Sequence, residues 1–148
     1  MTSIKKITDL ETYSVRRDVL RKGKPIETCQ FEGDDLSTTS HFGYYLNDNL
    51  VGIISIFKNN NNKFASTNQY QIRGMAVLEL HQKKGIGDLL VKHSEAYCKE
   101  LQTDLIWFNA RTAATGFYEK LGYTKIGTAF EIKDVGEHYL MAKILGNE

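Results

Sequence analysis

The chain of 148 residues has few of the residues that mark disulfide-rich, metal-binding or membrane proteins. Its two cysteines, Cys29 and Cys98, lie far apart and form no C-x-x-C pair, which argues against a disulfide scaffold and a thiolate metal site. Its four histidines show no H-x-x-x-H spacing, so no metal is expected. No run approaches the ~18 apolar residues of a membrane helix, and the polar N-terminus lacks the apolar core of a signal peptide. These absences predict a cytoplasmic protein with no membrane partner.

The chain also lacks an excess of charge of one sign. Its 19 Lys and Arg residues nearly balance its 18 Asp and Glu residues, so the formal net charge is +1. No global field therefore favours a nucleic acid as partner, and any basic function must be local. Hydrophobic residues make up 41% of the chain. A chain of this length buries roughly two-thirds of its unfolded surface, so we expect one domain, 1–148, with a hydrophobic core.

The first regular segment that the sequence predicts is a helix. Residues 9–21 carry apolar side chains at helical spacing, with Arg16 among the polar residues between them. We expect Asp9 to act as the N-cap of this helix, because a short carboxylate side chain can accept the first backbone N–H groups. Gly23 and Pro25 end it.

The rest of the chain predicts strands and helices within one layered fold. The turn Asn47-Asp48-Asn49 joins strands at 42–46 and 50–57, since these residues tolerate left-handed backbone. The apolar end of the strand at 70–78 is typical of a central strand buried on both faces. Further elements are helices at 85–101 and 113–121, the latter closed by Gly122, and strands at 105–108, 130–132 and 138–144. This order indicates an α/β fold with a mixed, partly antiparallel central sheet flanked by helices.

The loop Gln82-Lys83-Lys84-Gly85-Ile86-Gly87 is the clearest functional signal, because it lies between the central strand and the following helix. The first N–H groups of a helix have no internal partner, and the helix macrodipole adds positive charge there. The two glycines let a phosphate approach the backbone, and the two lysines add mobile charges. The loop therefore predicts a cradle for a phosphate or pyrophosphate.

Other phosphate sites have patterns that this loop lacks. A P-loop needs G-x-x-x-x-G-K-[ST], and no lysine-hydroxyl pair follows these glycines. A Rossmann site needs a third glycine at position 90, where this chain has Leu90. On the loop alone, a plain helix start with small residues for packing stays open.

Two motifs in order resemble the GCN5-related N-acetyltransferase (GNAT) family. They are Ile72 to Val77 with Gln82 to Gly87 and Leu89-Leu90, and then Asn109-Ala110-Arg111, Ala114 and Phe117 to Tyr123. Together they cover about residues 70–123. The resemblance implies an acyl-CoA N-acyltransferase (GNAT) type fold, with the sheet splayed between two central parallel strands, 70–78 and 103–109.

The resemblance also implies that acetyl-CoA is the co-substrate and that its pantetheine arm lies in the splay. Main-chain groups of Met75, Ala76 and Val77 would pair with the arm like an added strand. Asn109 and Phe117 would flank the thioester end. The residues implied at the pyrophosphate are Gln82, Lys83, Lys84, Gly85, Ile86, Gly87 and Asp88.

The implied reaction is direct transfer of an acetyl group to a primary amine of a small molecule or peptide. Tyr118 is the expected acid, because a phenol can donate a proton to the CoA sulfur, and the N–H of Val77 could polarise the thioester carbonyl. The base is left between Glu79, just past the central strand, and His138, in a segment similar to one in a subset of the family. A packing tyrosine, a solvated carboxylate and a structural histidine are the alternatives for these three positions.

Two positions depart from the family pattern. Arg111 stands where the family usually has asparagine, which questions a contact to the pantetheine and leaves room for a charge contact to the cofactor. Asp88 follows the glycines where a small or basic residue is frequent, and its carboxylate competes with a phosphate at the helix N-terminus. Arg73 and His41 are further candidates in the cleft.

The sequence thus favours an acetyltransferase of the EC 2.3.1 type. The alternative is a non-catalytic acyl-CoA-binding sensor or regulatory module of the same fold. Family members often form homodimers, so a homodimer stays open.

Overall fold

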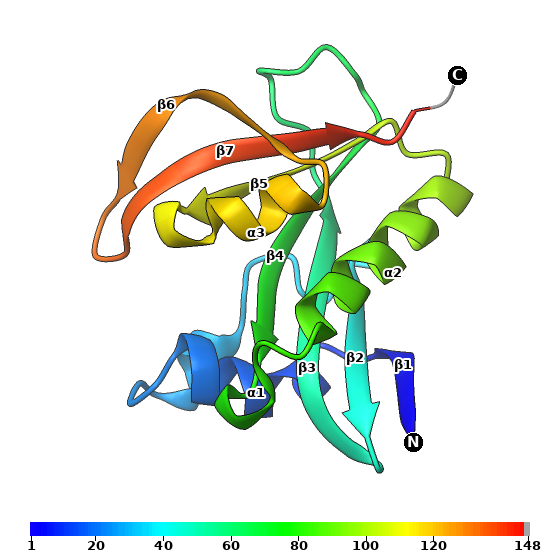
Figure 1. The fold of residues 1–148 in the computed structure, drawn as a ribbon, viewed down its shortest axis with the longest axis vertical. Coiled ribbons are helices and arrows are strands. Elements are labelled where there is room, and N and C mark those ends of the chain that lie inside the picture. Colours follow the sequence, from blue (N-terminus) through cyan, green and yellow to red (C-terminus); the bar gives the residue numbers. More distant parts are fainter. Residues whose placement is uncertain (147–148) are drawn as a thin grey trace.

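Seven strands form one mixed sheet in the computed structural model, which describes residues 1–146 (Figure 1). The strand order is β1-β2-β3-β4-β5-β7-β6. The strands are β1 (Thr2–Ile7), β2 (Ser40–Leu46), β3 (Asn49–Lys58), β4 (Gln69–Val77), β5 (Leu105–Arg111), β6 (Thr124–Ile132) and β7 (Gly136–Ile144). Every neighbouring pair is antiparallel except β4 and β5, so the mixed, partly antiparallel sheet predicted from the sequence is confirmed.

The parallel strands β4 and β5 are paired along only part of their length. Their register pairs end at Gln71 opposite Trp107, although β4 continues to Val77 and β5 to Arg111. Beyond these pairs the strands diverge, and in Figure 1 β4 points down the page while β5 runs to the left. The predicted splay between the two central parallel strands is therefore confirmed, and it opens towards their carboxyl ends.

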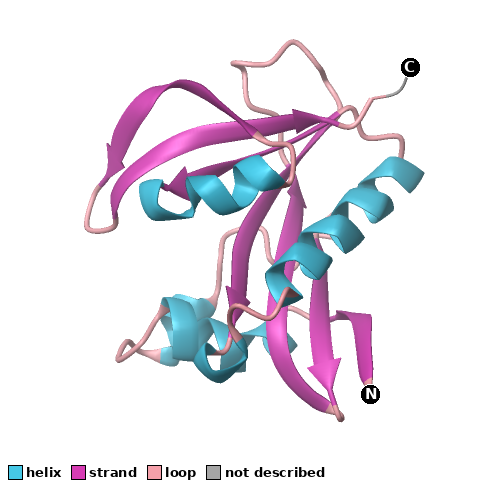
Figure 2. Cartoon of the chain, viewed as in Figure 1, coloured by secondary structure: helices cyan, strands magenta, loops and turns pink. Residues whose placement is uncertain are grey.

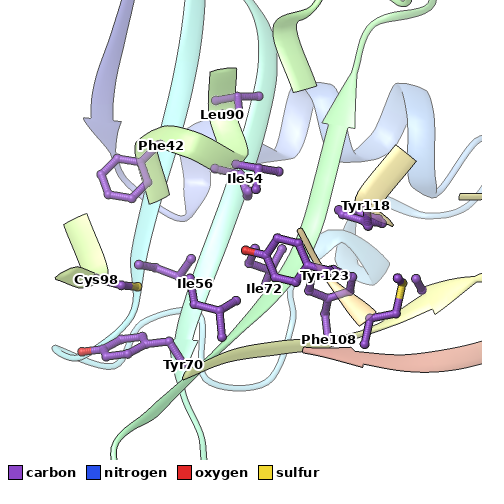
Figure 3. Packing of buried hydrophobic residues seen from close by; sticks show 14 of the residues in the cluster. Phe42, Ile54, Ile56, Tyr70, Ile72, Leu90, Cys98, Phe108, Tyr118 and Tyr123 are labelled. Atoms are coloured by element: carbon purple, nitrogen blue, oxygen red, sulfur yellow. The ribbon is translucent and has the colours of Figure 1, made fainter. Parts of the chain in front are cut away.

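Helices cover both faces of the sheet, with α2 and α3 in front of it in Figure 2. Side chains of successive residues in β3 point to opposite faces of the sheet and pack against different helices. Ile54 packs with Leu90 of α2 in the main core (Figure 3), whereas Ile53 packs with Val15 of α1. The helices are α1 (Tyr13–Val15), α2 (Ile86–Glu100) and α3 (Thr115–Lys120), with a π-helical turn at Arg16–Leu20 and 3₁₀ turns at Leu10–Thr12, Ile26–Cys29, Glu79–His81 and Thr112–Ala114.

The helical segment predicted at 9–21 is present but irregular, and its cap differs from the prediction. Asp9 makes no side-chain cap bond. Instead the Thr8 hydroxyl accepts a bond from the N–H of Glu11 at 3.2 Å, and the Glu11 carboxylate accepts one from the N–H of Thr8 at 2.8 Å. Because this capping box satisfies both donors reciprocally, the prediction that Asp9 caps the helix was wrong.

Arg16, placed by the sequence among the polar residues of that segment, is fully buried. Its guanidinium donates to both carboxylate oxygens of Asp34, at 2.6 and 3.0 Å, to the carbonyl of Cys29 at 2.7 Å and to the hydroxyl of Ser55 at 3.1 Å. The carboxylate balances the buried charge, which makes the burial tolerable. Asp34 also accepts a bond from the N–H of Phe31 at 2.9 Å, so the ion pair fixes the segment after α1 against the sheet.

The remaining differences concern strands with mostly exposed side chains. Strand β1 pairs with β2 and was not predicted, and β6 begins at Thr124 rather than at residue 130. Neither strand shows a clean alternation of apolar residues. The tight turn with positive φ at Asn47 and Asp48 and the left-handed Gly122 after α3 are confirmed. Within residues 1–146, no helix is long and apolar enough to cross a membrane.

Candidate functional site

The loop before α2 presents backbone N–H groups that the helix does not use. Lys83 and Gly85 have positive φ values of 64° and 84°, and α2 begins after Gly85 without a side-chain cap. The N–H of Leu89 donates to the carbonyl of Gly85 at 3.1 Å, as the first backbone bond of the helix. The N–H groups at 86–88 therefore have no partner in a preceding turn. Together with the helix macrodipole they favour an anion.

The two glycines of this loop have different surroundings. A Cβ atom at Gly85 would meet nothing within 4 Å, so this position faces open space. A Cβ atom at Gly87 would lie 3.3 Å from both the Met75 methyl group and the Phe117 ring. The loop thus fits a group that approaches over Gly85, while Gly87 allows α2 to pack closely on β4 and α3.

The end of β4 contributes backbone groups to the same place. The N–H of Leu78 donates to the carbonyl of Val51 in β3 at 2.8 Å. Because backbone groups alternate in direction along a strand, the N–H and carbonyl of Val77 point away from β3, into the splay. The side-chain amide of Gln82 donates to that carbonyl at 2.8 Å and so fastens the loop to the strand.

A cavity of about 310 Å³, which we call the cradle cavity, lies over this loop. Of the residues that the resemblance implies at the cofactor, only Ala76, Lys84 and Asn109 do not line it. Its lining residues are Met75, Val77, His81, Gln82, Lys83, Gly85, Ile86, Gly87, Asp88, Ala114, Phe117 and Tyr118. The structure therefore gathers most of the predicted cofactor residues around one space.

A second cavity of about 620 Å³, which we call the splay cavity, lies between the diverging strands. Its walls come from β4, from β5 and from the first helical segment. Its lining residues are 19–21, Phe31, 71–75, 108–111, Ala114, Tyr118, Ile132 and His138. Met75, Ala114 and Tyr118 line both cavities, so the two spaces meet at these three residues.

Tyr118 of α3 offers a protonated hydroxyl at that meeting point. Its ring packs against Phe108, with ring centroids 4.3 Å apart (Figure 3). Burial raises the pKa of Tyr118 to about 12, so the phenol keeps its proton at neutral pH. Within residues 1–146 the Tyr118 hydroxyl has no hydrogen-bond partner, and its oxygen remains accessible from the cavities although the ring is buried. The proton is therefore available to a bound group.

His138 of β7 lines the splay cavity together with Tyr118. Its Nδ1 lies 2.7 Å from the carbonyl of Gly136, and because a carbonyl only accepts, Nδ1 must carry the proton. The other ring nitrogen, Nε2, is then the basic one. Arg111 is the partner of His138 in the β5–β7 register, which puts both side chains on the same face of the sheet.

Glu79, the other predicted base, lies elsewhere. It begins the 3₁₀ turn after β4, is exposed, and lines a separate hollow with Arg17 and Asp18 of the first helical segment. Of the two predicted bases, only His138 therefore shares a cavity with Tyr118.

Two further positions have local partners. Asp88 lines the cradle cavity, and its Oδ2 lies 3.5 Å from Nζ of Lys92, one turn further along α2. The positive charge of Lys92 partly offsets the negative charge of the Asp88 carboxylate, which would compete with a phosphate for the helix N-terminus. His41 is buried with both ring nitrogens engaged, at 2.6 Å from the Ser55 hydroxyl and 3.0 Å from the Asp34 carbonyl, so it serves the core.

Sequence reasoning missed one wall of the splay cavity. Phe31 and Arg21 line it, and the guanidinium carbons of Arg21 and Arg73 both lie 5.1 Å from the centroid of the Phe31 ring. These residues come from three separate segments of the chain. No spacing in the sequence marks them as a group, because only the folded sheet brings them together.

The chain is similar to known proteins in sequence and in fold. A model of the acetyltransferase (GNAT) family matches residues 5–123. The uncharacterized N-acetyltransferase YitI of Bacillus subtilis (strain 168) is 32% identical over 145 residues, which cover 98% of this chain and 97% of that protein. The ribosomal-protein-S18-alanine N-acetyltransferase of Escherichia coli aligns with a TM-score of 0.75 at 17% identity, over 100% of this chain and 96% of its own. An aminoglycoside 6′-N-acetyltransferase complexed with coenzyme A gives a TM-score of 0.76 at 16% identity, over 99% and 98% of the two chains.

Proposed function

The chain belongs to the acetyltransferase (GNAT) family and is an N-acetyltransferase, and we propose that it moves the acetyl group of acetyl-CoA directly to a primary amine of a small molecule or peptide. One observation carries the proposal: Tyr118 lines both the cradle cavity and the splay cavity. A phenol in that position can reach a thioester that enters from one space and an amine that enters from the other. We also propose that residues 1–148 form a single domain of this family, supported by the family match over 5–123.

In this proposal the cradle holds the pyrophosphate of the cofactor. The N–H groups at 86–88 donate to its oxygens, and Lys83 and Lys84 add positive charge. Gly85 keeps the approach open, and main-chain groups of β4 before Val77 pair with the pantetheine arm as an added strand would, which leaves the N–H of Val77 for the thioester. The aminoglycoside 6′-N-acetyltransferase that shares the fold is complexed with coenzyme A, which supports coenzyme A as the ligand of this proposal.

The chain's own residues then carry the proton transfers. Bound acetyl-CoA supplies an acetyl group activated as a thioester. Nε2 of His138 accepts a proton from the incoming amine, directly or through a water molecule. The N–H of Val77 polarises the thioester carbonyl, and the hydroxyl of Tyr118 donates its proton to the departing sulfur. Asn109, in the splay cavity, and Phe117, in the cradle cavity, lie on either side of the reacting groups.

The test separates cofactor binding from turnover. Acetyl-CoA, CoA and ATP are each added to the protein, and the change in melting temperature is measured. We expect stabilisation by acetyl-CoA and CoA, because a ligand that binds only the folded state raises its stability. Release of free thiol is then followed over a panel of primary amines. Stabilisation by ATP alone would exclude a CoA site, and binding without turnover on any amine would favour a sensor or regulatory module of the same fold.

A further inference from the structure

The splay cavity carries positive charge that the transfer reaction itself does not need. Its lining includes Arg21, Arg73, Arg111 and His138, but no Asp or Glu. None of these three arginines takes part in an ion pair within residues 1–146. A half-enclosed space with several cations and no carboxylate in its walls favours an anionic ligand.

Arg73 of β4 is held by contacts other than an ion pair. Its guanidinium carbon lies 5.1 Å from the ring centroids of both Phe31 and Phe57. Its Nη1 donates to the carbonyl of Glu32, at 3.5 Å. Burial lowers the pKa of Arg73 through desolvation, the largest cause, and the neighbouring charges of Arg16 and Arg21 act in the same direction, whereas the carboxylates of Asp34 and Glu32 oppose the shift. An arginine has five N–H donors, so most of them can serve a ligand.

The position of this arginine is fixed by packing around Phe31. The Arg16 guanidinium, already balanced by Asp34, lies 3.8 Å from the Phe31 ring centroid. Gly74 has a φ of 68° where the β3–β4 register shifts, and a Cβ atom there would lie 2.9 Å from the Phe31 ring. The Phe31 ring therefore packs directly on the irregular part of β4 at Gly74, next to Arg73. A cation held in this way needs little reorganisation when an anion binds.

The opposite wall of the splay cavity also carries positive charge. Arg111 lies near the end of β5 and pairs in register with His138 of β7. Both line the splay cavity, whereas Lys83 of the pyrophosphate loop lines the cradle cavity. The two sets of cations are thus separated, with Tyr118 where the cavities meet. Because the cradle already provides for the anionic part of the cofactor, the splay cations are left for the acceptor.

We propose that the acceptor is a primary amine that also carries an anionic group, a carboxylate or a phosphate, bound by Arg73 and Arg21 with Arg111 opposite. The inference rests on the proposed function, since it names the acceptor of that reaction. A guanidinium binds either anion through two parallel N–H bonds. A polycationic acceptor would meet charges of its own sign in the same cavity.

The substrate test uses primary amines of graded chain length that end in a carboxylate, a phosphate, a hydroxyl or a second amine. Rates are compared at equal concentrations of neutral amine and saturating acetyl-CoA. We expect kcat/KM for the anionic amines to exceed that of the matched hydroxyl compounds by about 10-fold or more, with the diamines lowest. The better of the carboxylate and phosphate series identifies the group. Equal rates in all series, or a preference for the diamines, would overturn the proposal.

Variants of single arginines test which of them bind the anionic group of the acceptor. Arg73→Gln should raise KM for the anionic amine by about 10- to 100-fold and leave KM for acetyl-CoA unchanged. Arg111→Gln changes an exposed side chain, so it leaves the fold intact and should act in the same direction more weakly. Arg17→Gln removes an exposed arginine outside the splay cavity and is the matched control. A rise in KM for acetyl-CoA in place of the amine would mean that the arginines serve the cofactor.

Binding is measured apart from turnover, so that this proposal and the proposed function can fail separately. The CoA-bound protein is titrated calorimetrically with the anionic amine and with its hydroxyl analogue. We expect tighter binding of the anion, a loss of that advantage in Arg73→Gln, and weakening with added salt. Such binding without acetylation of any amine would defeat the proposed function and leave the anion site standing. Acetylation that is fastest with the hydroxyl amines would defeat the anion site and leave the acetyltransferase standing.

Discussion

The two cavities that meet at Tyr118 are built from different parts of the chain. The cradle cavity depends on backbone, with the left-handed Gly85, the uncapped start of α2 and the N–H of Val77. The splay cavity depends on side chains, chiefly arginines and His138, that come from several elements. Backbone groups can bind the part of a ligand that never changes, whereas side chains can be exchanged without altering the fold. Changes in the cradle should therefore abolish all transfer, and changes in the splay should alter which amine is used.

The largest expected effect is in the cradle. Gly85→Glu should lower acetyl-CoA affinity on the order of 1,000-fold, because the new carboxylate enters the open space over the loop and displaces at least two charge-assisted bonds. Calorimetric titration with acetyl-CoA measures it. Gly127→Glu is the matched control, since Gly127 also has a positive φ and open space around a Cβ atom but lies in β6. Equal affinity in the two variants would mean that the pyrophosphate binds elsewhere.

The next effect concerns the residue that both cavities share. Tyr118→Phe should lower kcat about 100-fold, because the sulfur then leaves without a proton, while KM for acetyl-CoA stays unchanged. The hydroxyl has no partner within residues 1–146, so its loss should leave the melting temperature nearly constant. Tyr97→Phe, which removes a hydroxyl bonded to Ser40 at 3.2 Å, is the control and should keep full kcat. Unchanged turnover in Tyr118→Phe would remove the acid role.

A smaller effect separates the two predicted bases. His138→Gln should lower kcat/KM roughly 10- to 100-fold, because Nε2 no longer accepts the amine proton. Glu79→Gln should have the weaker effect, because Glu79 lines a different hollow from Tyr118. A larger loss in Glu79→Gln would reverse the assignment of the base.

The smallest effect is on stability at alkaline pH. Burial raises the pKa of Tyr118 from 10.0 to about 12, so the unfolded chain loses this proton at lower pH than the folded one. The stability that depends on the neutral phenol is thus complete below pH 10 and is lost as the pH rises towards 12. Near pH 11 the loss should be about 1 kcal/mol. Urea unfolding of the wild type and Tyr118→Phe should show this difference, and parallel curves would mean that the phenol is not buried.

The difference between the two cavities also explains what could be predicted from the sequence. The cradle needs glycines at a fixed spacing before a helix, so the positions of Gly85 and Gly87 in the sequence are enough to predict it. The splay cavity needs charged side chains from distant segments, and nothing in the sequence relates Arg21 or Phe31 to Arg73. The base could not be chosen either, because Glu79 is nearer to the motif in sequence, whereas only the folded structure shows that His138 lines the same cavity as Tyr118.

The errors in the predicted fold have the same origin. The sequence places Arg16 only among the polar residues of its helical segment, and it gives no sign of burial because the partner, Asp34, lies 18 residues further along the chain. The Thr8 to Glu11 capping box was overlooked because Asp9 is an equally good capping residue type. Strand β1 (Thr2–Ile7) has mostly exposed side chains, so only its pairing with β2 reveals it. In each case the deciding contact is not local in sequence or not apolar.

A crystal structure of the protein with bound CoA tests most directly whether the two cavities divide cofactor and acceptor at Tyr118. We predict that the pyrophosphate accepts bonds from the N–H groups at 86–88, and that the sulfur lies within about 3.5 Å of the Tyr118 hydroxyl. The splay cavity beside Arg73 would then remain open for an amine. A pyrophosphate bound to Arg21 and Arg73, or a sulfur directed away from Tyr118, would contradict this division.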